Sequence, residues 1–530
     1  MRETREGDDM AMTKDERLAA VHEEALQEFD RIQSALQHER SICLEDRRFY
    51  SIAGAQWEGP LGDQFENKPR FEFNKVHLSV IRIINEWRNN RITVDFIPKD
   101  GSTNLELADT CDGLYRADEQ DSGAQEAYDN AFEEAVGGGF GAWRLRAEYE
   151  DDDDDENERQ RICIEPIFDA DSSVFFDLDA KRQDKADAKR CFVLASYTPE
   201  AFEAEFGHNP TDWPKAVQQR EFDWSTPEVV YVAEYYRVEE VPETIHVFRG
   251  LDGEEMRVPG QQLKDDEDKL DELLATGFRL VRQKRVKRRR VHKYILSGAQ
   301  VEEDCGLIAG RCIPVIPVYG KRWFVDNIER CMGHVRLAKD AQRLMNSLLS
   351  WLTEIAARFD TEKPILTPEQ VNGHAAMWAQ DNVKRFPYLL LNQIRDGNGD
   401  PVAGTAQPLA YTKAPNVPPA MAALIQIASQ ALDDLLGNQQ AGEQLQPNQS
   451  GKAVELVQNR LDMQVFIYMS NMAKAMKRCG EVWLSMAKDV LIEDERKMKM
   501  VATDGEIDTV TLRQPTIDPK TGEQVLKNDL

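Results

Sequence analysis

The sequence contains no long apolar run, no apolar leader and no paired cysteines. A membrane-spanning helix needs roughly 18 uninterrupted apolar residues; no stretch approaches that length, so we predict no membrane contact. Residues 1–15 are charged, so we expect no secretory signal. The cysteines form no Cys-x-x-Cys pair and have no histidine at zinc-finger spacing, which predicts reduced thiols in the core. They are Cys43, Cys111, Cys163, Cys191, Cys305, Cys312, Cys331 and Cys479.

Catalytic motifs are also missing. The glycine-rich string 137–141 has no Lys-Ser/Thr after it, and Gly451-Lys452 is followed by Ala453 where Mg²⁺ would need a hydroxyl, so we predict backbone turns and not phosphate loops. Neither G-x-S-x-G nor H-E-x-x-H occurs. We expect His334 in the polar part of a long helix and His292 among arginines, both as ordinary surface histidines. The sequence therefore predicts no enzyme, no cofactor and no metal.

Acidic residues outnumber basic ones by 95 to 66, which gives a net charge of −29. A field of this sign repels nucleic acid and anionic membranes, so a generic DNA-coating protein is excluded. Segment 95–158 carries 21 acidic residues and accounts for over half of the net charge. Its peak, 151–156, is predicted to be the solvated tip of a hairpin. A Ca²⁺ or Mg²⁺ site is the alternative, but the run lacks the glycine and the spaced glutamate of an EF-hand loop.

The sign reverses in segment 281–293, where eight of thirteen residues are basic and none is acidic. The flanking valines, Tyr294 and Ile295 predict a strand with basic faces. Three roles stay open for it: contact with a neighbouring subunit or another protein, contact with DNA, or a merely solvated strand. The basic residues are Arg282, Lys284, Arg285, Lys287, Arg288, Arg289, Arg290 and Lys293.

Apolar periodicity predicts an α+β, helix-rich fold. The length of 530 residues indicates more than one domain. Thr13 and Glu16 form a predicted capping box at the start of the first helix. The predicted helices are 13–51, 76–89, 199–206, 265–274, 328–359, 420–436 and 450–490. The predicted strands are 91–98, 143–149, 161–168, 191–196, 229–237, 244–248, 281–293 and 385–394, the last followed by a turn at 397–399. Helices as long as 328–359 and 450–490 suggest a bundle, a coiled coil or a ring of packed helices.

Several strings, in this order and spacing, together resemble the portal proteins of tailed double-stranded DNA bacteriophages of the short-tailed podovirus type. The strings begin with Phe73-Asn-Lys-Val-His-Leu and Arg91-Ile-Thr-Val-Asp-Phe-Ile-Pro, followed by Glu134-Ala-Val-Gly-Gly-Gly-Phe-Gly-Ala-Trp143. The later ones are Gly320-Lys-Arg-Trp-Phe-Val-Asp, Gly333-His-Val-Arg336, Lys339-Asp-Ala-Gln-Arg-Leu-Met-Asn346 and Asn448-Gln-Ser-Gly-Lys452.

The resemblance implies a head-to-tail connector, a ring of about twelve identical subunits at one capsid vertex. Double-stranded DNA is packaged through such a ring by the terminase and later ejected. The further partners that the resemblance implies are the capsid protein and its scaffold, and the head-completion and tail adaptor proteins. The implied location is the virion, with assembly in the host cytoplasm. Two alternatives are kept: a metal-dependent nucleic-acid processing enzyme that uses 151–155, and a virion adaptor or scaffold without a pore.

The portal architecture has a wing, a stem, a clip and a crown, and the resemblance maps these parts onto segments. The wing is 1–260, the first stem helix 261–279, the clip 280–325, the second stem helix 326–360, the wing return 361–419, the tunnel helix and loop 420–449, and the crown 450–530. The tunnel loop comprises Asn438, Gln439, Gln440, Gln444, Gln446, Asn448 and Gln449. Because the chain ends in strand-like sequence where relatives continue, we expect a C-terminal barrel to be absent or cut short.

Overall fold

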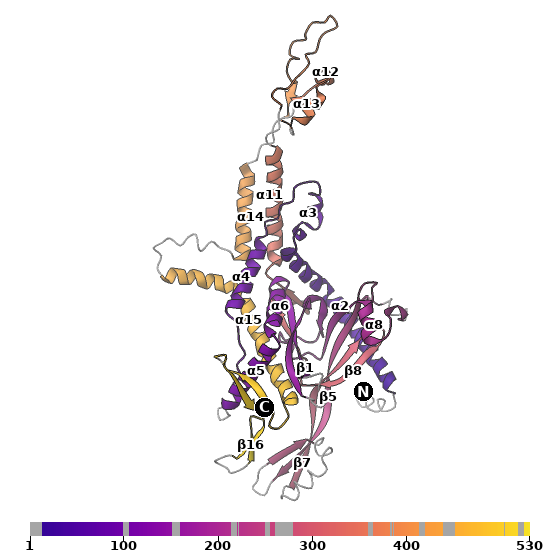
Figure 1. The fold of residues 1–530 in the computed structure, drawn as a ribbon, viewed down its shortest axis with the longest axis vertical. Coiled ribbons are helices and arrows are strands. Elements are labelled where there is room, and N and C mark those ends of the chain that lie inside the picture. The colour runs from indigo at the N-terminus through magenta and orange to yellow at the C-terminus, as the bar shows by residue number, and fades with distance from the viewer. Residues whose placement is uncertain are drawn as a thin grey trace. The chain divides into compact units, whose positions relative to one another are not determined.

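The computed structural model describes residues 13–98, 105–150, 159–213, 220, 222–249, 255–259, 279–358, 364–381, 384, 386–412, 419–437, 451–502, 504–517 and 524–529. The chain divides into two compact units (Figure 1). Unit 1 comprises Met1–Arg48, Val80–Arg336 and Ser450–Leu530, and unit 2 comprises Phe49–Ser79 and Leu337–Gln449. The predicted helix 265–274, the acidic run 151–156 and the tunnel-loop residues 438–449 lie outside the described residues.

Most regular structure lies in unit 1, and helices α2 Lys14–Ser51 and α4 Lys75–Asn89 each contain a boundary between the units. The other helices of unit 1 are α5 Leu105–Asp121, α6 Ala124–Gly137, α7 Ala170–Ser173, α8 Pro199–Phe206 and α15 Gly451–Val490, with a 3₁₀ turn at Pro210–Asp212. None of the described helices combines the length and apolar character needed to cross a bilayer.

In the part of unit 1 that the structure describes, the strands form two larger sheets and three two-stranded pairs. The six-stranded sheet has the order β3-β4-β5-β7-β8, with β6 paired to β5. Its strands are β3 Val174–Phe176, β4 Arg190–Tyr197, β5 Val230–Arg249, β6 Glu255–Pro259, β7 Arg279–Leu296 and β8 Val301–Ile308. The three-stranded sheet is β2 Gln160–Ile167, β1 Phe140–Tyr149 and β9 Val315–Tyr319. The two-stranded pairs are β10 Lys321–Val325 with β11 Ile328–Met332, β14 Lys497–Val501 with β15 Ile507–Thr511, and β16 Gln514–Ile517 with β17 Gln524–Lys527.

Helix α2 is the core helix of unit 1, as its apolar stripe predicts. The Thr13 amide donates to Glu16 Oε2 at 2.9 Å and the Glu16 amide donates to Thr13 Oγ1 at 3.4 Å, which confirms the capping box. The fully buried Phe29 makes edge contacts with Phe175 and Phe192 of the six-stranded sheet, at ring separations of 5.4 Å. The stripe spaced at three and four residues therefore becomes the seam between one helix and one sheet.

Glycines fix the junction of α6, β1 and the β10–β11 hairpin. A Cβ on Gly141 would lie 2.1 Å from the Ala131 carbonyl oxygen, and one on Gly333 would lie 2.2 Å from the Gly137 carbonyl oxygen. Gly139 has φ +118°, a conformation that side chains disfavour. The predicted turn at 137–141 is therefore confirmed, and its glycines are needed for close backbone packing.

Unit 2 contains a pair of packed helices and a set of short elements. Helices α11 Lys339–Arg358 and α14 Pro419–Leu436 lie side by side (Figure 1). The short elements are a 3₁₀ turn at Ala55–Trp57, α3 Pro60–Asp63, α12 Pro368–Val371, α13 Ala375–Gln380, and the pair β12 Pro364–Ile365 with β13 Ala410–Tyr411. A further 3₁₀ turn, Arg336–Ala338, precedes α11. The turn at 397–399 is confirmed, with the Gly399 amide donating to the Asp396 carbonyl at 2.8 Å.

A row of buried polar side chains on α11 binds the extended backbone before α4. Gln342, Asn346 and Ser350 recur every four residues and are almost completely buried. Asn346 Oδ1 accepts from the Phe73 amide at 3.1 Å, and Ser350 Oγ accepts from the Phe71 amide at 3.0 Å. Gln342 Nε2 donates to the Phe73 carbonyl at 2.6 Å. We call Gln342, Asn346 and Ser350 the polar ladder. It supplies hydrogen-bond partners to the backbone groups of Phe71 and Phe73, whose segment pairs with no described strand.

The predicted helix 328–359 is wrong over its first third. Residues Ile328–Met332 form strand β11, and the helix begins only at Lys339. The turn between β10 and β11 places Asp326 and Asn327 at positive φ, 52° and 63°, as two-residue hairpins require. Gly333 then passes too close to α6 for any side chain, so the apolar pattern belongs to a hairpin and a loop.

Three strand predictions also need correction. Segment 91–98 is extended but joins no sheet, because its Phe96 amide donates to Asp112 of α5 at 2.7 Å. The described residues of 385–394 form no strand, and Asn392 donates its amide to the Gln370 carbonyl at 2.9 Å. The predicted strands 229–237 and 244–248 are one strand, β5, because its continuous pairing with β7 carries it through Pro242.

The other predictions of regular structure hold within a few residues. They are the helices 13–51, 76–89, 199–206, 420–436 and 450–490, and the strands 143–149, 161–168, 191–196 and 281–293.

Candidate functional site

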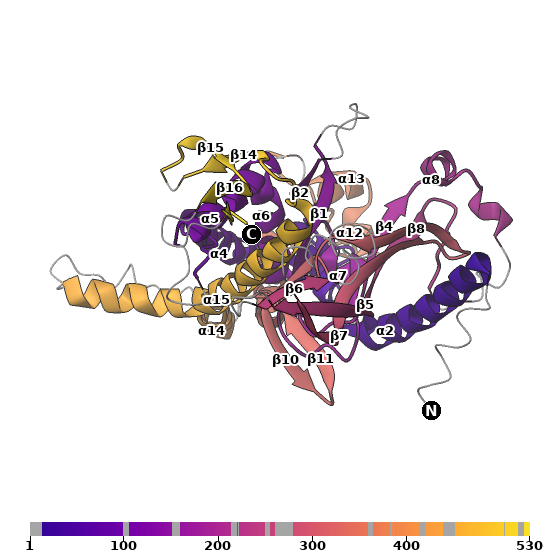
Figure 2. The same cartoon turned by 90° about the horizontal axis from the view of Figure 1, so that it is seen from below.

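The basic run lies on β7, as predicted, and β7 pairs along its length with β5. The register sets Arg290 opposite Glu239 and Arg289 opposite Glu240, with an irregularity between Val247 and Phe248. Figure 2 shows β5, β6 and β7 next to one another. Residues 279–285 are all exposed, whereas Val291, Tyr294 and Leu296 are buried. The strand is therefore anchored at its C-terminal end and exposed along its first residues.

Lys293, at the anchored end, belongs to a half-buried charge cluster. Its Nζ lies 3.0 Å from Glu234 of β5, and Arg144 of β1 lies 2.7 Å from the same carboxylate. The Tyr236 hydroxyl donates to Glu234 at 2.8 Å. Burial alone would raise the pKa of Glu234, but Arg144 and Lys293 outweigh it and lower the pKa below its ordinary value. Lys293 is thus used inside unit 1 to join its two larger sheets.

Arg290 is also used within unit 1. Its Nη1 lies 2.6 Å from Asp489 near the end of α15, and the same carboxylate accepts from the Gly310 amide at 2.9 Å. Lys287 lies 3.3 Å from Glu240, but both side chains are largely exposed, so this pair contributes little.

The middle of β7, at Arg288 and Arg290, borders a hollow of about 490 Å³. Its lining is Gln160, Val241, Pro242, Arg288, Arg290, Leu307, Ile308, Ala309, Asp489 and Ile492.

Four cations of the run differ from these. Arg282, Lys284, Arg285 and Arg289 form no ion pair with the residues that the structure describes. We call them the outer basic group. Three of them lie in the exposed stretch 279–285, and Arg289 is an exposed residue just before the anchored Arg290. Leu280 and Val281 of the same stretch are 44% and 48% exposed. The run thus contains an anchored set and a set whose charge is available to a partner.

Comparison with known proteins decides which kind of protein carries this strand. The family model of phage P22-like portal proteins matches residues 26–530. The portal protein of Acyrthosiphon pisum secondary endosymbiont phage 1 is 39% identical over 523 residues, which are 97% of this chain and 72% of the relative. The chain belongs to the phage P22-like portal protein family. The predicted portal function is confirmed, and nothing in the comparisons favours the metal-dependent enzyme or the adaptor without a pore.

Several strings that carry the portal resemblance contact each other. In unit 2 the string that begins at Phe73 is bound by Gln342 and Asn346 of the string 339–346. In unit 1 the glycines of 137–141 pack against Gly320 and Gly333 of two others. These strings therefore build the frame of the portal subunit, and the basic run is not among them.

The two histidines singled out from the sequence are not ordinary surface residues of the portal protein. His292 stacks on Tyr294 with ring centroids 4.2 Å apart, and its Nε2 lies 2.6 Å from Asp304 Oδ1. His334 is buried, precedes α11, and donates its amide to the Val136 carbonyl at 2.7 Å. Both predictions were wrong because local charge and helical periodicity do not reveal what packs against a side chain.

Sequence reasoning missed the carboxylates that hold the anchored cations. Glu234 is the one charged residue of the stretch 230–236, which otherwise consists of valine, alanine and tyrosine, and a single charge there is a usable sign of a buried pair. Asp489 gives no such signal near the end of its amphipathic helix.

Metal binding gains no support from the part of the portal chain that the structure describes. There, no group of three or more His, Cys, Asp or Glu side chains is placed to hold a metal ion. The acidic run 151–156 lies outside those residues, so the absence of a metal stays a prediction.

Proposed function

We propose that this portal protein assembles into a closed ring of about twelve copies at one vertex of the capsid. Through this ring the terminase packages double-stranded DNA, which later leaves through the tail. The chain itself catalyses no reaction in this proposal. Its partners are other copies of itself, the terminase, the capsid protein and scaffold, and the head-completion and tail adaptor proteins.

The apolar surface of α14 carries this proposal. One stripe of the helix is buried: Met421, Ala428, Leu432 and Leu436. A second stripe at helical spacing is exposed: Leu424, Ile427, Ala431 and Leu435. Ile427 is 62% exposed although no side chain of the stripe is polar. A contiguous apolar stripe on a highly charged chain is typical of a surface that another protein covers.

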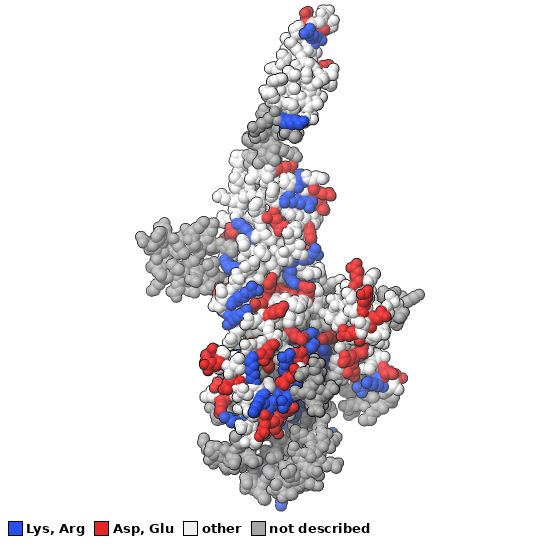
Figure 3. All heavy atoms as spheres, viewed as in Figure 1, with Lys and Arg blue, Asp and Glu red and all other residues white. Residues whose placement is uncertain are grey.

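Helix α11 repeats the pattern. Leu344 and Trp351 stand one heptad apart and are 48% and 46% exposed, while the polar ladder occupies the buried side. On the face seen in Figure 3 the surface over α14 is largely uncharged. Both helices of the pair therefore have apolar surface that is available to further copies, and this exposed surface supports the proposed ring.

The net charge suits a channel through which DNA slides. Each cation that neutralises a phosphate adds affinity and salt dependence, and that affinity would act as a brake. A chain with 29 more acidic than basic charges keeps that affinity low. We propose that the outer basic group, Arg282, Lys284, Arg285 and Arg289, instead contacts an acidic surface of a neighbouring copy or of a docked protein.

We also propose a different position for stem and clip than the sequence suggested. Segment 280–325 contributes β7 and β8 to the sheet that holds β4 and β5 of the expected wing, which supports wing and not clip. Helices α11 and α14 pack together in unit 2 and bracket, along the chain, the short elements of 364–412. This pattern supports α11 and α14 as stem helices and 364–412 as clip. The segment 438–449 after α14 remains our proposal for the tunnel loop.

Native mass spectrometry of the purified chain tests the ring, with negative-stain class averages as the second readout. We expect a discrete oligomer of about twelve chains whose end-on averages show a central channel. A particle that stays monomeric at every protein and salt concentration would overturn the proposal. An oligomer without a channel would support the adaptor instead.

A further inference from the structure

Two cysteine thiols from distant parts of the chain contact each other inside unit 1. Cys43 of α2 and Cys331 of β11 are separated by 288 residues, yet their Sγ atoms lie 3.8 Å apart. Cys43 is completely buried and Cys331 is 4% exposed. A disulfide needs the sulfurs about 2.05 Å apart, so a bond requires a further approach of about 1.8 Å. The pair packs at the glycine junction, where the Cys43 carbonyl lies close to Gly138.

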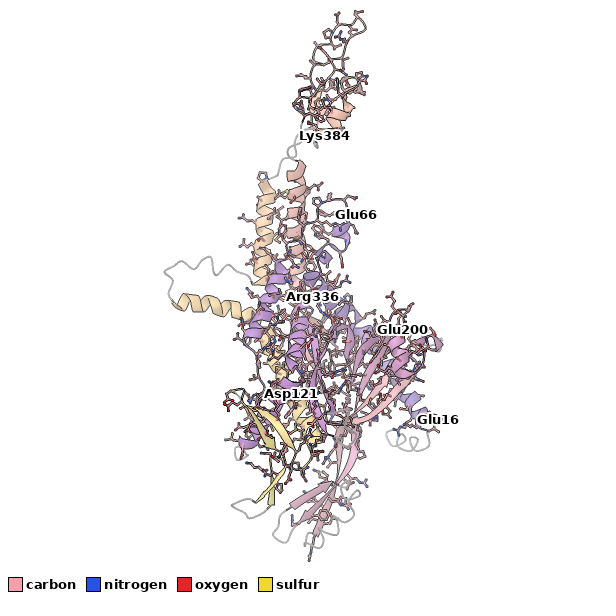
Figure 4. The ribbon with its side chains drawn as sticks, in the orientation of Figure 1. Glu16, Glu66, Asp121, Glu200, Arg336 and Lys384 are labelled. Atoms are coloured by element: carbon pink, nitrogen blue, oxygen red, sulfur yellow. The ribbon has the colours of Figure 1, made fainter. Side chains whose placement is uncertain are left out.

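The surroundings of the pair favour a thiolate on Cys43. Arg336, labelled in Figure 4, donates from Nη2 to Cys43 Sγ at 3.3 Å. Arg336 is itself held by Asp46 at 2.7 Å and Glu39 at 2.6 Å, so its guanidinium is fixed beside the sulfur.

The hydrogen bond from Cys331 lowers the pKa of Cys43, and Arg40 and Arg336 support this shift against the opposing effects of burial and of the Asp46 carboxylate. The same hydrogen bond, together with burial, raises the pKa of Cys331. One member of the pair is therefore prepared to ionise first while the other keeps its proton.

We propose that Cys43 and Cys331 form a redox-sensitive pair that a peroxide converts into a disulfide. The Cys43 thiolate attacks one peroxide oxygen, so that an S–O bond forms, the O–O bond breaks, sulfur is oxidised and hydroxide leaves. The sulfur of Cys331 then attacks the sulfenic acid, the S–S bond forms, and the S–O bond breaks. The released oxygen leaves as water with the proton of the Cys331 thiol. The proton that Cys43 loses on ionisation converts the hydroxide into a second water, so that in sum two thiols and one peroxide give one disulfide and two waters.

Such a bond would tie the core helix α2 to the hairpin strand β11. Other cysteines lack this arrangement: Cys163 donates to Glu148, and Cys479 accepts from Tyr115 and Trp143. The chemistry is independent of the proposed portal ring. Only the circumstances in which the disulfide would form rest on the proposed function. A particle that leaves a reducing cytoplasm meets oxidants that the assembling subunit does not.

Treatment of the purified, folded chain with hydrogen peroxide tests the pair. After blocking of the remaining thiols and cleavage with trypsin, the peptides 41–47 and 331–336 each carry one of the two cysteines. We expect them to appear joined, at a mass about 2 Da below the sum of the two, and to separate on addition of a thiol reductant.

The Cys43→Ser variant should lose the joined peptide, while Cys312→Ser, which changes a half-exposed cysteine elsewhere, should keep it. Oxidation of Cys305 and Cys312 to acids without any joined 41–47 and 331–336 peptide would overturn the proposal. So would independent oxidation of Cys43 and Cys331 to sulfinic acids. Because the readout uses the chain in solution, a missing disulfide and a missing ring are separate results.

Discussion

Asp118 shows how one buried carboxylate ties the stability of unit 1 to pH. It lies in α5 and accepts from Trp483 Nε1 of α15 at 2.7 Å. Burial raises its pKa from 3.8 to about 7, although the hydrogen bond from Trp483 acts in the opposite direction. Between pH 3.8 and about 7, the folded chain therefore holds a proton on Asp118 that the unfolded chain has already released. The resulting stability is present in full below pH 3.8 and is lost as pH rises through about 7.

We predict that Asp118→Asn stabilises the protein more at pH 8 than at pH 5, because the amide keeps the hydrogen bond and carries no charge. The upper limit at pH 8 follows from about 1.4 kcal/mol per pKa unit, hence a few kcal/mol. Thermal unfolding at the two pH values measures the difference. Asp109→Asn, an exposed change on the same helix, should leave both midpoints unaltered. An equal effect of Asp118→Asn at both pH values would contradict the linkage.

The outer basic group can be separated from the anchored cations by substitution. We predict that replacing Arg282, Lys284 and Arg285 together by alanine leaves subunit stability unchanged and lowers the oligomer fraction, more strongly at low salt. Arg290→Ala should instead lower subunit stability by about 1 kcal/mol, because it leaves Asp489 without its cation. Thermal unfolding and native mass spectrometry of both variants give the two readouts. Unchanged assembly in the triple variant would exclude contact between copies and leave a docked protein or solvent opposite the outer basic group.

Single residues also mark the limit of reading function from the sequence. The charge run on β7 was visible because eight cations stand in thirteen residues. Which of them a partner can reach was not visible, since Glu234 and Asp489 stand far from the run in the chain and contact it only in the fold.

At the scale of elements, the polar ladder of α11 holds unit 2 together. Asn346 is 1% exposed, accepts from the Phe73 amide and donates to Gln56 Oε1 at 2.6 Å. We predict that Asn346→Leu destabilises unit 2 by about 1–3 kcal/mol, because a buried amide and a buried carbonyl lose their partners. Hydrogen exchange of the peptide that contains Phe71 and Phe73 should become faster.

Ser347→Ala is the matched control for this change. Ser347 is the next residue on α11 and bonds only within its helix, to the Leu344 carbonyl at 2.9 Å. Exchange in segment 71–75 should stay as it is in the unaltered chain. Acceleration by Ser347→Ala to the same extent would mean that the helix, and not the ladder, protects the segment.

Elements were predictable where periodicity and burial coincide. The apolar stripe of α2 and the strands β1 and β2 could be predicted from residue spacing alone, because each of these elements packs against the rest of unit 1. The start of α11 did not, since residues 328–338 have helix-like apolar spacing but are held by a hairpin and by glycine contacts. Segment 91–98 has strand-like alternation, yet it packs Phe96 against Tyr115 and Trp483 without a strand partner.

At the scale of the whole molecule, assembly depends on apolar surface that one copy cannot cover. We predict that Ile427→Asp leaves the unfolding midpoint of the isolated subunit unchanged, because the side chain is 62% exposed there. The same change should abolish the oligomer, because a carboxylate would be buried without a partner between copies. Gln430→Asp, an exposed polar position on the same helix, should still assemble. Normal rings from Ile427→Asp would show that this stripe is not an interface.

The sequence was sufficient to predict the family. The portal strings were recognisable because they build the frame of the subunit, in which a side chain on Gly141 would clash with the Ala131 backbone and Asn346 accepts from the Phe73 amide. The clip at 280–325 stays a prediction, and our proposal of wing for this segment comes from the pairing of β7 and β8 with β4 and β5. The basic run alone does not distinguish the two, because a strand with basic faces has the same sequence pattern in a separate module and in a continuous sheet.

The polar ladder has a last consequence, which concerns sequence divergence. Its hydrogen bonds to segment 71–75 go to the backbone, while Phe71 and Phe73 are 41% and 51% exposed. Main-chain recognition leaves those outward positions free to change without loss of the fold. Related phages could therefore alter this surface to fit different neighbours, whereas Gln342, Asn346 and Ser350 would have to persist.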